Sequence, residues 1–337
     1  MIRKTILCIS LLLASLSLYG QIKNLKTDST QNNFNLPSNY KTSEAGGIPH
    51  YTKSGKGKKT LIMIAGYGFD ETIFDDFIKD NRKNYTIYAV TIPGFGKTMA
   101  AATPPDGTSF SKATWSKGTL EGLRKLIVKE KLDRPVIVGH FTLGTQLAVR
   151  MALDYPELVG GVVIIGGPAK FIPVQNGKPM NATLEMRIMG VDKFSAAFFK
   201  VVSKETWDSN SYLSSLYSLN EVTAKKCWDM QASVPLQVMV RYLMEFSATD
   251  ITFEINKIKC PMLVLRPDFT NEMISHPEDG TTNYIKPQFI DSWDEVKKLN
   301  PAVEIKDIFN SGTFIWKDQP KQCSEAILSF VQGLNEP

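Results

Sequence analysis

The sequence predicts a doubly wound α/β fold, in which a mostly parallel central sheet carries helices on both faces. The apolar runs at residues 60–66, 135–140 and 161–167 are continuous rather than alternating, which is typical of strands buried on both faces. Segments with apolar residues at helical spacing lie between them, as at residues 114–132. Strands that alternate with helices along a chain form parallel sheets covered by helices.

Each element has its own pattern. Two short strand-like runs and a turn rich in glycine and lysine (KSGKGKK) precede residue 60. Residues 85–96 form a strand that ends in a Pro-Gly turn, and residues 114–132 place Leu120, Leu123, Leu126 and Ile127 on one helix face. In chain order we expect strand 60–66, a helix near 70–81, strand 85–96, helix 114–132, strand 135–140, helix 144–156 and strand 161–167.

The alternation stops after residue 170. Residues 171–255 read as helices only, and six of the twelve methionines lie between Met180 and Met244. Such methionines suit an adaptable apolar wall, or the insertion's own core. Aromatic residues accompany them: Phe198, Phe199, Trp207, Trp228, Tyr242 and Phe246. Alternation resumes over residues 256–337, so we expect a core of residues 21–170 and 256–337 with a helical cap at 171–255.

The first twenty residues are expected to be a secretory signal peptide. Arg3 and Lys4 precede an apolar stretch, and small residues lead to a Gly20-Gln21 junction. An N-terminal membrane anchor is the alternative, although the apolar run is short for a spanning helix. We therefore expect an exported protein, periplasmic or secreted, whose mature chain has no membrane span.

Charge and cysteine content exclude several classes of partner. Loss of Arg3 and Lys4 would lower the formal charge from +5 to +3, which is too mild to indicate nucleic-acid binding. The three cysteines after residue 20 are odd in number, and their spacing fits no metal site. They are Cys227, Cys260 and Cys323. We expect free thiols, with a single bridge as the alternative, and we expect neither a metal nor a cofactor. The oligomeric state is open.

Four segments in register resemble the α/β-hydrolase superfamily over nearly the whole mature chain. They are an oxyanion-type loop (IAGYGFDETIF), a Pro-Gly turn (VTIPGFGKT), a nucleophile elbow with its helix (VIVGHFTLGTQLAVRMALDYPELV) and the segment after the last strand (NSGTFIWKDQPKQCSEAILSF). The resemblance implies an α/β-hydrolase fold with a helical cap inserted after the sixth strand. It also implies a nucleophile, a histidine and an acid at set positions.

All three triad positions are replaced. In the elbow the family pattern Gly-His-Ser-x-Gly-Gly falls on residues 139–144, which puts Phe141 at the serine and Leu143 at a glycine. The acid position is Thr270, with Asp268 two residues away, and the histidine position is Thr313. Phenylalanine has no nucleophilic atom, so the residues indicate a pseudoenzyme that keeps the fold and has lost the triad.

Relocated chemistry has one candidate set, consisting of Thr142, Asp268 and His276. His50 is expected far from the site, and His140 is expected to support the elbow. A threonine nucleophile needs a base within hydrogen-bond reach.

The alternative to relocated chemistry is a ligand pocket with backbone donors on one side and apolar cap residues above. Its expected ligand-binding residues are Gly66, Tyr67, Gly68, Phe141, Thr142 and Phe314.

Three functions follow from these observations. The first is an exported protein that binds a small, largely apolar ligand without serine-hydrolase turnover. The second is a hydrolase or lyase of small ester- or amide-like substrates that uses the relocated groups. The third is a protein–protein interaction module, which would need a filled pocket and apolar groups outside.

Overall fold

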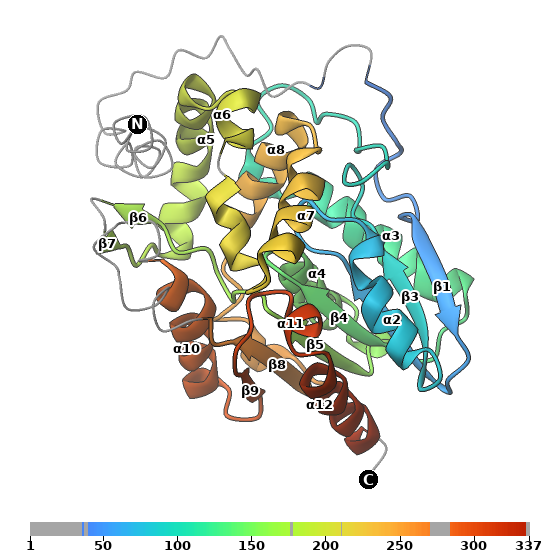
Figure 1. Ribbon diagram of the computed structural model, residues 1–337. Helices are drawn as coiled ribbons and strands as arrows, with labels where there is room; N and C mark the ends of the chain where they lie inside the picture. Colours follow the sequence, from blue (N-terminus) through green and yellow to red (C-terminus); the bar gives the residue numbers. More distant parts are fainter. Residues whose placement is uncertain (1–35, 37–39, 176–177, 210, 270–283, 335–337) are drawn as a thin grey trace.

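A seven-stranded sheet forms the centre of the protein. The structure is a computed structural model that describes residues 36, 40–175, 178–209, 211–269 and 284–334. The strand order is β1-β3-β2-β4-β5-β8-β9, and only β1 runs antiparallel to its neighbour (Figure 1). The strands are β1 (Tyr51–Gly55), β2 (Lys59–Ile64), β3 (Tyr85–Val90), β4 (Val136–His140), β5 (Gly161–Ile165), β8 (Met262–Pro267) and β9 (Glu304–Ile308). The predicted fold class, an α/β fold with a mostly parallel sheet, is confirmed.

Helices cover both faces of this sheet. Helices α2 (Asp75–Asn81) and α12 (Pro320–Gly333) pack together on one face, whereas α3 (Thr114–Lys129) and α4 (Leu143–Asp154) lie on the other (Figure 1). Helices α10 (Ser292–Leu299) and α11 (Ile315–Asp318) belong to the last third of the chain. Shorter helical turns are η2 (Glu71–Phe74), η3 (Phe110–Lys112), η4 (Pro156–Leu158), η5 (Ser211–Leu216), η6 (Ile255–Lys257) and η8 (Lys286–Asp291).

The segment between β5 and β8 forms a cap. It contains α5 (Leu184–Val201), α6 (Lys204–Asp208), α7 (Glu221–Ala232) and α8 (Leu236–Ser247), which gather at one end of the sheet (Figure 1). Two short antiparallel strands, β6 (Val174–Gln175) and β7 (Lys178–Pro179), precede α5, where the sequence predicted helices only.

Counted over the described residues, the cap follows the fifth strand of the sheet, whereas the sequence predicted the sixth. Of the two strand-like runs expected before residue 60, β1 enters the sheet, and the described residues of the other run form no strand. Among the described residues upstream of β1, Ser43 makes a single bridge to Ala101. Both runs are short and partly polar, so the sequence alone does not show that β1 pairs with β3 along its length whereas Ser43 makes a single bridge.

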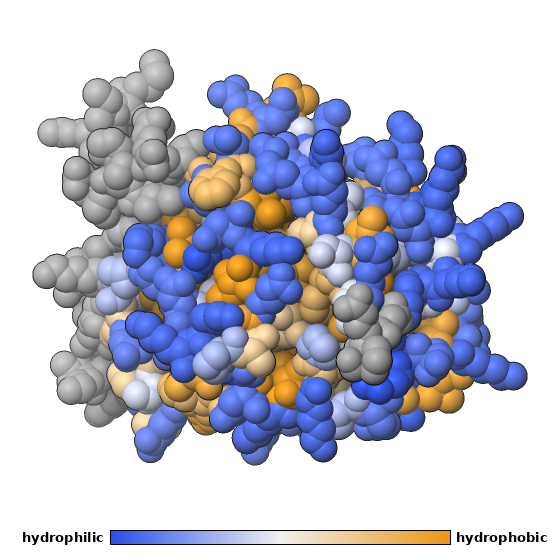
Figure 2. Space-filling model, turned by 90° about the horizontal axis from the view of Figure 1, so that it is seen from below, coloured by the Kyte–Doolittle hydropathy of each residue, from blue (hydrophilic) through white to orange (hydrophobic). Residues whose placement is uncertain are grey.

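Apolar side chains gather around the sheet and beneath the cap. Leu61 to Ile64 of β2 are completely buried, as is Ala65 directly after the strand. Val162 to Ile165 of β5 are completely buried as well. Seen from the end opposite the cap, the surface is mostly hydrophilic, with apolar groups scattered among the polar ones (Figure 2). Among the described residues, no helix has both the length and the apolar character needed to cross a bilayer.

Candidate functional site

The strand-to-helix turn after β4 is the elbow predicted from the sequence. Phe141 and Thr142 join β4 to α4, and both have positive φ angles, 43° and 39°. A non-glycine residue in this region is uncommon, and two in succession mark a tight, strained turn. The turn is close-packed on both sides. A Cβ added to Gly139 would lie 2.4 Å from the carbonyl oxygen of Gly144, and one added to Gly144 would lie 2.9 Å from that of Ile64.

The turn allows two registers, because Leu143 stands where the family pattern has its first glycine after the serine. In Gly-x-Ser-x-Gly three residues separate the glycines, whereas the four residues 140–143 separate Gly139 from Gly144. Counting from the strand places Phe141 at the nucleophile, as in the sequence analysis, whereas counting back from the helix places Thr142 there. Thr142, with φ 39° and ψ −101°, directly precedes α4. The wider glycine spacing was visible in the sequence and identifies this second register.

A cavity of about 150 Å³ lies between the elbow and the cap. Its wall is mostly aromatic and combines residues that follow β2 and β4 with residues from all four cap helices. The lining residues are Tyr67, Phe141, Thr142, Phe171, Ile172, Phe194, Phe198, Trp207, Leu216, Tyr217, Gln231, Leu243, Phe246, Tyr284, Gln288 and Phe289. None of the described lining residues is a methionine, so the cap methionines do not form the expected wall.

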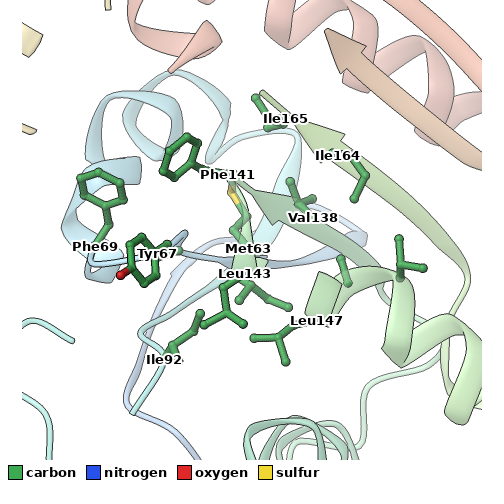
Figure 3. Packing of buried hydrophobic residues seen from close by; sticks show 14 of the residues in the cluster. Met63, Tyr67, Phe69, Ile92, Val138, Phe141, Leu143, Leu147, Ile164 and Ile165 are labelled. Carbon is green, nitrogen blue, oxygen red and sulfur yellow. The ribbon is translucent and has the colours of Figure 1, made fainter. Parts of the chain in front are cut away.

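Phe141 forms part of the cavity wall at the elbow. Its ring stacks on Phe289 at 6.1 Å between centroids, and it meets Tyr217 edge-on at 5.7 Å. Close by, Figure 3 shows Phe141 beside Phe69 and Tyr67 above the sheet residues. Such offset and edge-to-face pairs stabilise an aromatic cluster beyond the area they bury. The side chain at the serine position in the strand-side register therefore serves as packing surface.

Most polar atoms on the cavity wall hold the cap to the core. The Tyr67 phenol donates to the Met239 carbonyl at 2.8 Å, and the Gln231 amide donates to the Tyr67 carbonyl at 2.7 Å. The Tyr217 phenol donates to Oε1 of Gln231. Burial raises the pKa of both phenols well above the ordinary value. Tyr67 and Tyr217 are therefore neutral hydrogen-bond donors and cannot act as bases near neutral pH.

The predicted oxyanion-type loop lies against the elbow. A Cβ on Gly66 would come within 2.7 Å of the Phe141 Cβ, so this glycine allows the close approach. Gly68 has φ +84° and faces the Gln231 side chain. Of the loop residues predicted to bind ligand, Tyr67 lines the cavity, whereas Gly66 and Gly68 shape the backbone around it.

The remaining predicted residues lie away from the cavity or outside the described residues. Phe314 is completely buried, and its ring centroid is 4.4 Å from that of His140. The Thr313 hydroxyl donates to the Leu216 carbonyl at 2.9 Å. Asp268 accepts from the Ser311 N–H at 3.3 Å and is not on the cavity wall. Thr270 and His276 lie outside the described residues, so the relocated set stays a prediction.

His140 does not face the cavity. Its imidazole is completely buried among aromatic rings, with Phe314 at 4.4 Å and Trp316 at 4.7 Å, and neither ring nitrogen has a hydrogen-bond partner. Burial lowers the pKa of His140 well below its ordinary value, the positive charge of Lys317 adds to the shift, and a poorly aligned contact with the Thr313 backbone opposes it only in part. The ring is neutral at physiological pH and supports the elbow from behind.

No acid or base lines the described part of the cavity. Its residues include no histidine, carboxylate, lysine, arginine or cysteine. The Thr142 hydroxyl is buried there without a hydrogen-bond partner. Elsewhere in the described chain, no group of three or more His, Cys, Asp or Glu side chains could hold a metal ion.

Solved structures with this architecture include several esterases. The structure aligns with MenH from S. aureus at a TM-score of 0.62 and 15% identity, covering 85% of this chain and 99% of that one. It aligns with a thermophilic esterase from Thermogutta terrifontis at 0.60 and 15%, covering 85% and 94%. In sequence it is 30% identical over 133 residues to a 2-hydroxy-6-oxononadienedioate/2-hydroxy-6-oxononatrienedioate hydrolase of Paraburkholderia phymatum. The chain has the α/β-hydrolase fold, and part of its sequence resembles hydrolases and esterases of that superfamily.

The likeness in sequence is partial. The match to the Paraburkholderia enzyme covers 37% of this chain and 43% of that protein. A pimeloyl-[acyl-carrier protein] methyl ester esterase of Citrobacter koseri is 24% identical over 117 residues, which cover 35% and 40%. The chain thus spans less than half the length of these curated relatives. No family model matches the sequence. This protein keeps the mostly parallel sheet and the strand-to-helix turn of that fold.

Proposed function

We propose that this protein binds a small, largely apolar ligand in the cavity under its cap and has no serine-hydrolase turnover. The observation that carries this function is the wall of the cavity, which is aromatic and, in its described part, lacks any group able to take a proton from Thr142. Apolar, concave and largely pre-formed sites with few polar groups are typical of small-molecule binding.

The elbow supplies a means of orienting such a ligand. The Leu143 N–H opens α4, where backbone donors have no intrahelical acceptor. Thr142 adds a hydroxyl next to it. These groups can hold a carbonyl oxygen in the ground state, which needs no general base.

Ester hydrolysis tests this function directly. The protein is incubated with p-nitrophenyl acetate, and a fluorophosphonate probe is used to label any activated hydroxyl. We expect no rate above that of heat-denatured protein and no labelling. Turnover that Thr142→Val abolishes would contradict a purely binding role.

A second candidate is a hydrolase that uses Thr142 as its nucleophile. Thr142 has a positive φ directly before α4, which is where an elbow nucleophile stands, and the curated relatives are named as hydrolases and esterases. The dioate substrate in one relative's name carries two carboxylates, for which the described wall offers no cation. A substrate of this protein would therefore be neutral. Loss of turnover in both Thr142→Val and His276→Ala, with His50→Gln unaffected, would support this function.

We also propose that the protein is exported and processed after Gly20. Arg3 and Lys4, the apolar stretch and the Gly20-Gln21 junction support this location. N-terminal sequencing of protein recovered from the cell envelope and the medium should give Gln21 as the first residue. An intact N-terminus in a membrane fraction would instead indicate an anchor.

A further inference from the structure

The strand β9 forms an open edge of the central sheet. It is the last strand in the order, and among the described residues the backbone groups of residues 304–307 bond only to β8. An unpaired strand edge can take up a strand from another chain, because its outward N–H and C=O groups are spaced for a ladder. The side chains on and beside β9 indicate which chain fits this edge.

A second copy of this chain can pair with β9 in only a few registers. Two copies related by a two-fold axis run antiparallel. Residues that face each other across an antiparallel ladder lie on the same face of the sheet, so the axis passes beside one residue that faces its own copy. With Ile305 at the axis, Glu304 faces Lys306 of the second copy. No other register centred within β9 sets opposite charges directly against each other.

Both charged residues are available for this pairing. The side chains of Glu304 and Lys306 are 46% and 39% exposed, and they form an ion pair at 3.1 Å within the strand. With Ile305 at the axis, two copies bring together four charges of alternating sign, and opposite charges across a ladder stabilise the pairing. Charged side chains on an edge strand usually hinder pairing, whereas this pattern is complementary to itself.

Exposed apolar side chains lie at both ends of β9. Phe309 directly follows the strand and is 64% exposed, and Leu299, at the end of α10 and before the strand, is 49% exposed. With Ile305 at the axis, Phe309 faces Pro301 of the second copy, two residues after that copy's Leu299. The two-fold axis therefore brings apolar groups of both copies together at each end of the contact.

We propose that two copies of this chain pair through β9, antiparallel and with Ile305 at the two-fold axis, so that their two sheets form one continuous sheet. No residue of β9 lines the described wall of the cavity. The contact therefore leaves the cavity free, and the proposal does not depend on the proposed binding function.

A charge swap tests the pairing. Sedimentation velocity over a wide range of concentrations gives the mass and the dissociation constant of the dimer. We expect wild type to form dimers. Glu304→Lys should raise the dissociation constant about tenfold or more, because it sets a lysine against Lys306 at two symmetry-related places. Glu304→Lys combined with Lys306→Glu should restore the wild-type value. Glu221→Lys, which adds the same charge at an exposed position in α7, should leave it unchanged.

Cysteine substitutions test the register independently. At Ile305 the Cα atoms of the two copies would be about 4.5–5.5 Å apart, which allows a disulfide. At Lys306 they would be about 8 Å apart, which is too far. Under mild oxidation Ile305→Cys should give a covalent dimer on a non-reducing gel. Lys306→Cys and wild type should not, although both retain Cys227, Cys260 and Cys323.

Two results would overturn the proposal. The first is a wild-type protein that stays monomeric at the highest concentration. The second is a dimer that Glu304→Lys does not weaken, that the double swap does not restore, or that Ile305→Cys does not cross-link, because the contact would then lie elsewhere. Neither result bears on ligand binding in the cavity.

Discussion

At the scale of single residues, His140 shows how burial changes the role of a catalytic residue type. It directly precedes the elbow turn, yet its ring packs against Phe314 and Trp316 rather than the cavity. An imidazole without a hydrogen-bond partner in such surroundings resists protonation. Its neutral form suits an aromatic cluster, so His140 acts as a core residue.

The lowered pKa of His140 predicts acid sensitivity. In the unfolded chain the ring takes up a proton near pH 6.5, whereas in the folded protein its pKa lies well below that value. The unfolded state therefore binds more protons below pH 6.5, and the free energy of unfolding falls by up to about 1.4 kcal/mol per pH unit until the folded pKa is reached. Urea denaturation of wild type and His140→Leu between pH 7.5 and 5 should show a smaller loss in the variant.

His50→Gln is the matched control for this effect. The His50 side chain is 54% exposed beside Glu71, so its substitution leaves the aromatic cluster around His140 intact. An equally steep acid loss in His140→Leu would show that other groups cause it.

At the scale of elements, the elbow depends on the close contact of β2, β4 and α4. Nine of the twelve residues of α4 are buried, which makes it the central helix of its face. Gly144 lets the first turn of α4 approach the end of β2. The neighbouring atom there is a backbone carbonyl oxygen, which cannot move without shifting the strand. Gly139 and Gly144 thus allow close packing at both ends of the turn that contains Phe141 and Thr142.

Gly144→Ala should destabilise the protein by about 1–3 kcal/mol, the usual cost of overpacking a filled site. Its Cβ would lie 2.9 Å from the Ile64 carbonyl oxygen. Thermal or urea unfolding measures the effect. Gly333→Ala in α12 is the matched control, because a Cβ there meets nothing within 4 Å, and it should be neutral or slightly stabilising. Equal stability of both variants would refute the close contact.

At the scale of the whole molecule, cap and core are joined by a buried carboxylate as well as by apolar contacts. Glu245 in α8 accepts from the backbone N–H groups of Trp115 and Ser116 at 3.0 and 2.8 Å, at the start of α3. Arg241, one turn earlier, lies over the Phe110 and Trp115 rings at 4.7 and 5.2 Å. A cap carboxylate thus accepts from the first N–H groups of α3, which have no acceptor within their own helix. This contact holds α8, which lines the cavity, against the core.

Glu245→Ala should lower the free energy of unfolding by roughly 2–4 kcal/mol, because it leaves buried N–H groups of α3 without an acceptor. Urea denaturation measures this loss. Glu221→Ala, at an exposed position in α7, should change stability by less than about 0.5–1 kcal/mol. A loss in Glu245→Ala no larger than that in Glu221→Ala would mean that the cap is held by apolar packing alone.

The sequence by itself determined the α/β class, the position of the strand-to-helix turn and the helical segments of the cap, because periodicity and turn residues encode local structure and burial. It did not determine the strand count before the cap, or that the cavity wall is built from aromatic residues such as Phe198, Trp207 and Phe246 rather than from the cap methionines. Those features depend on how helices far apart in the chain pack against the sheet. Only the tertiary structure brings the elbow and the cap helices together around one aromatic cavity.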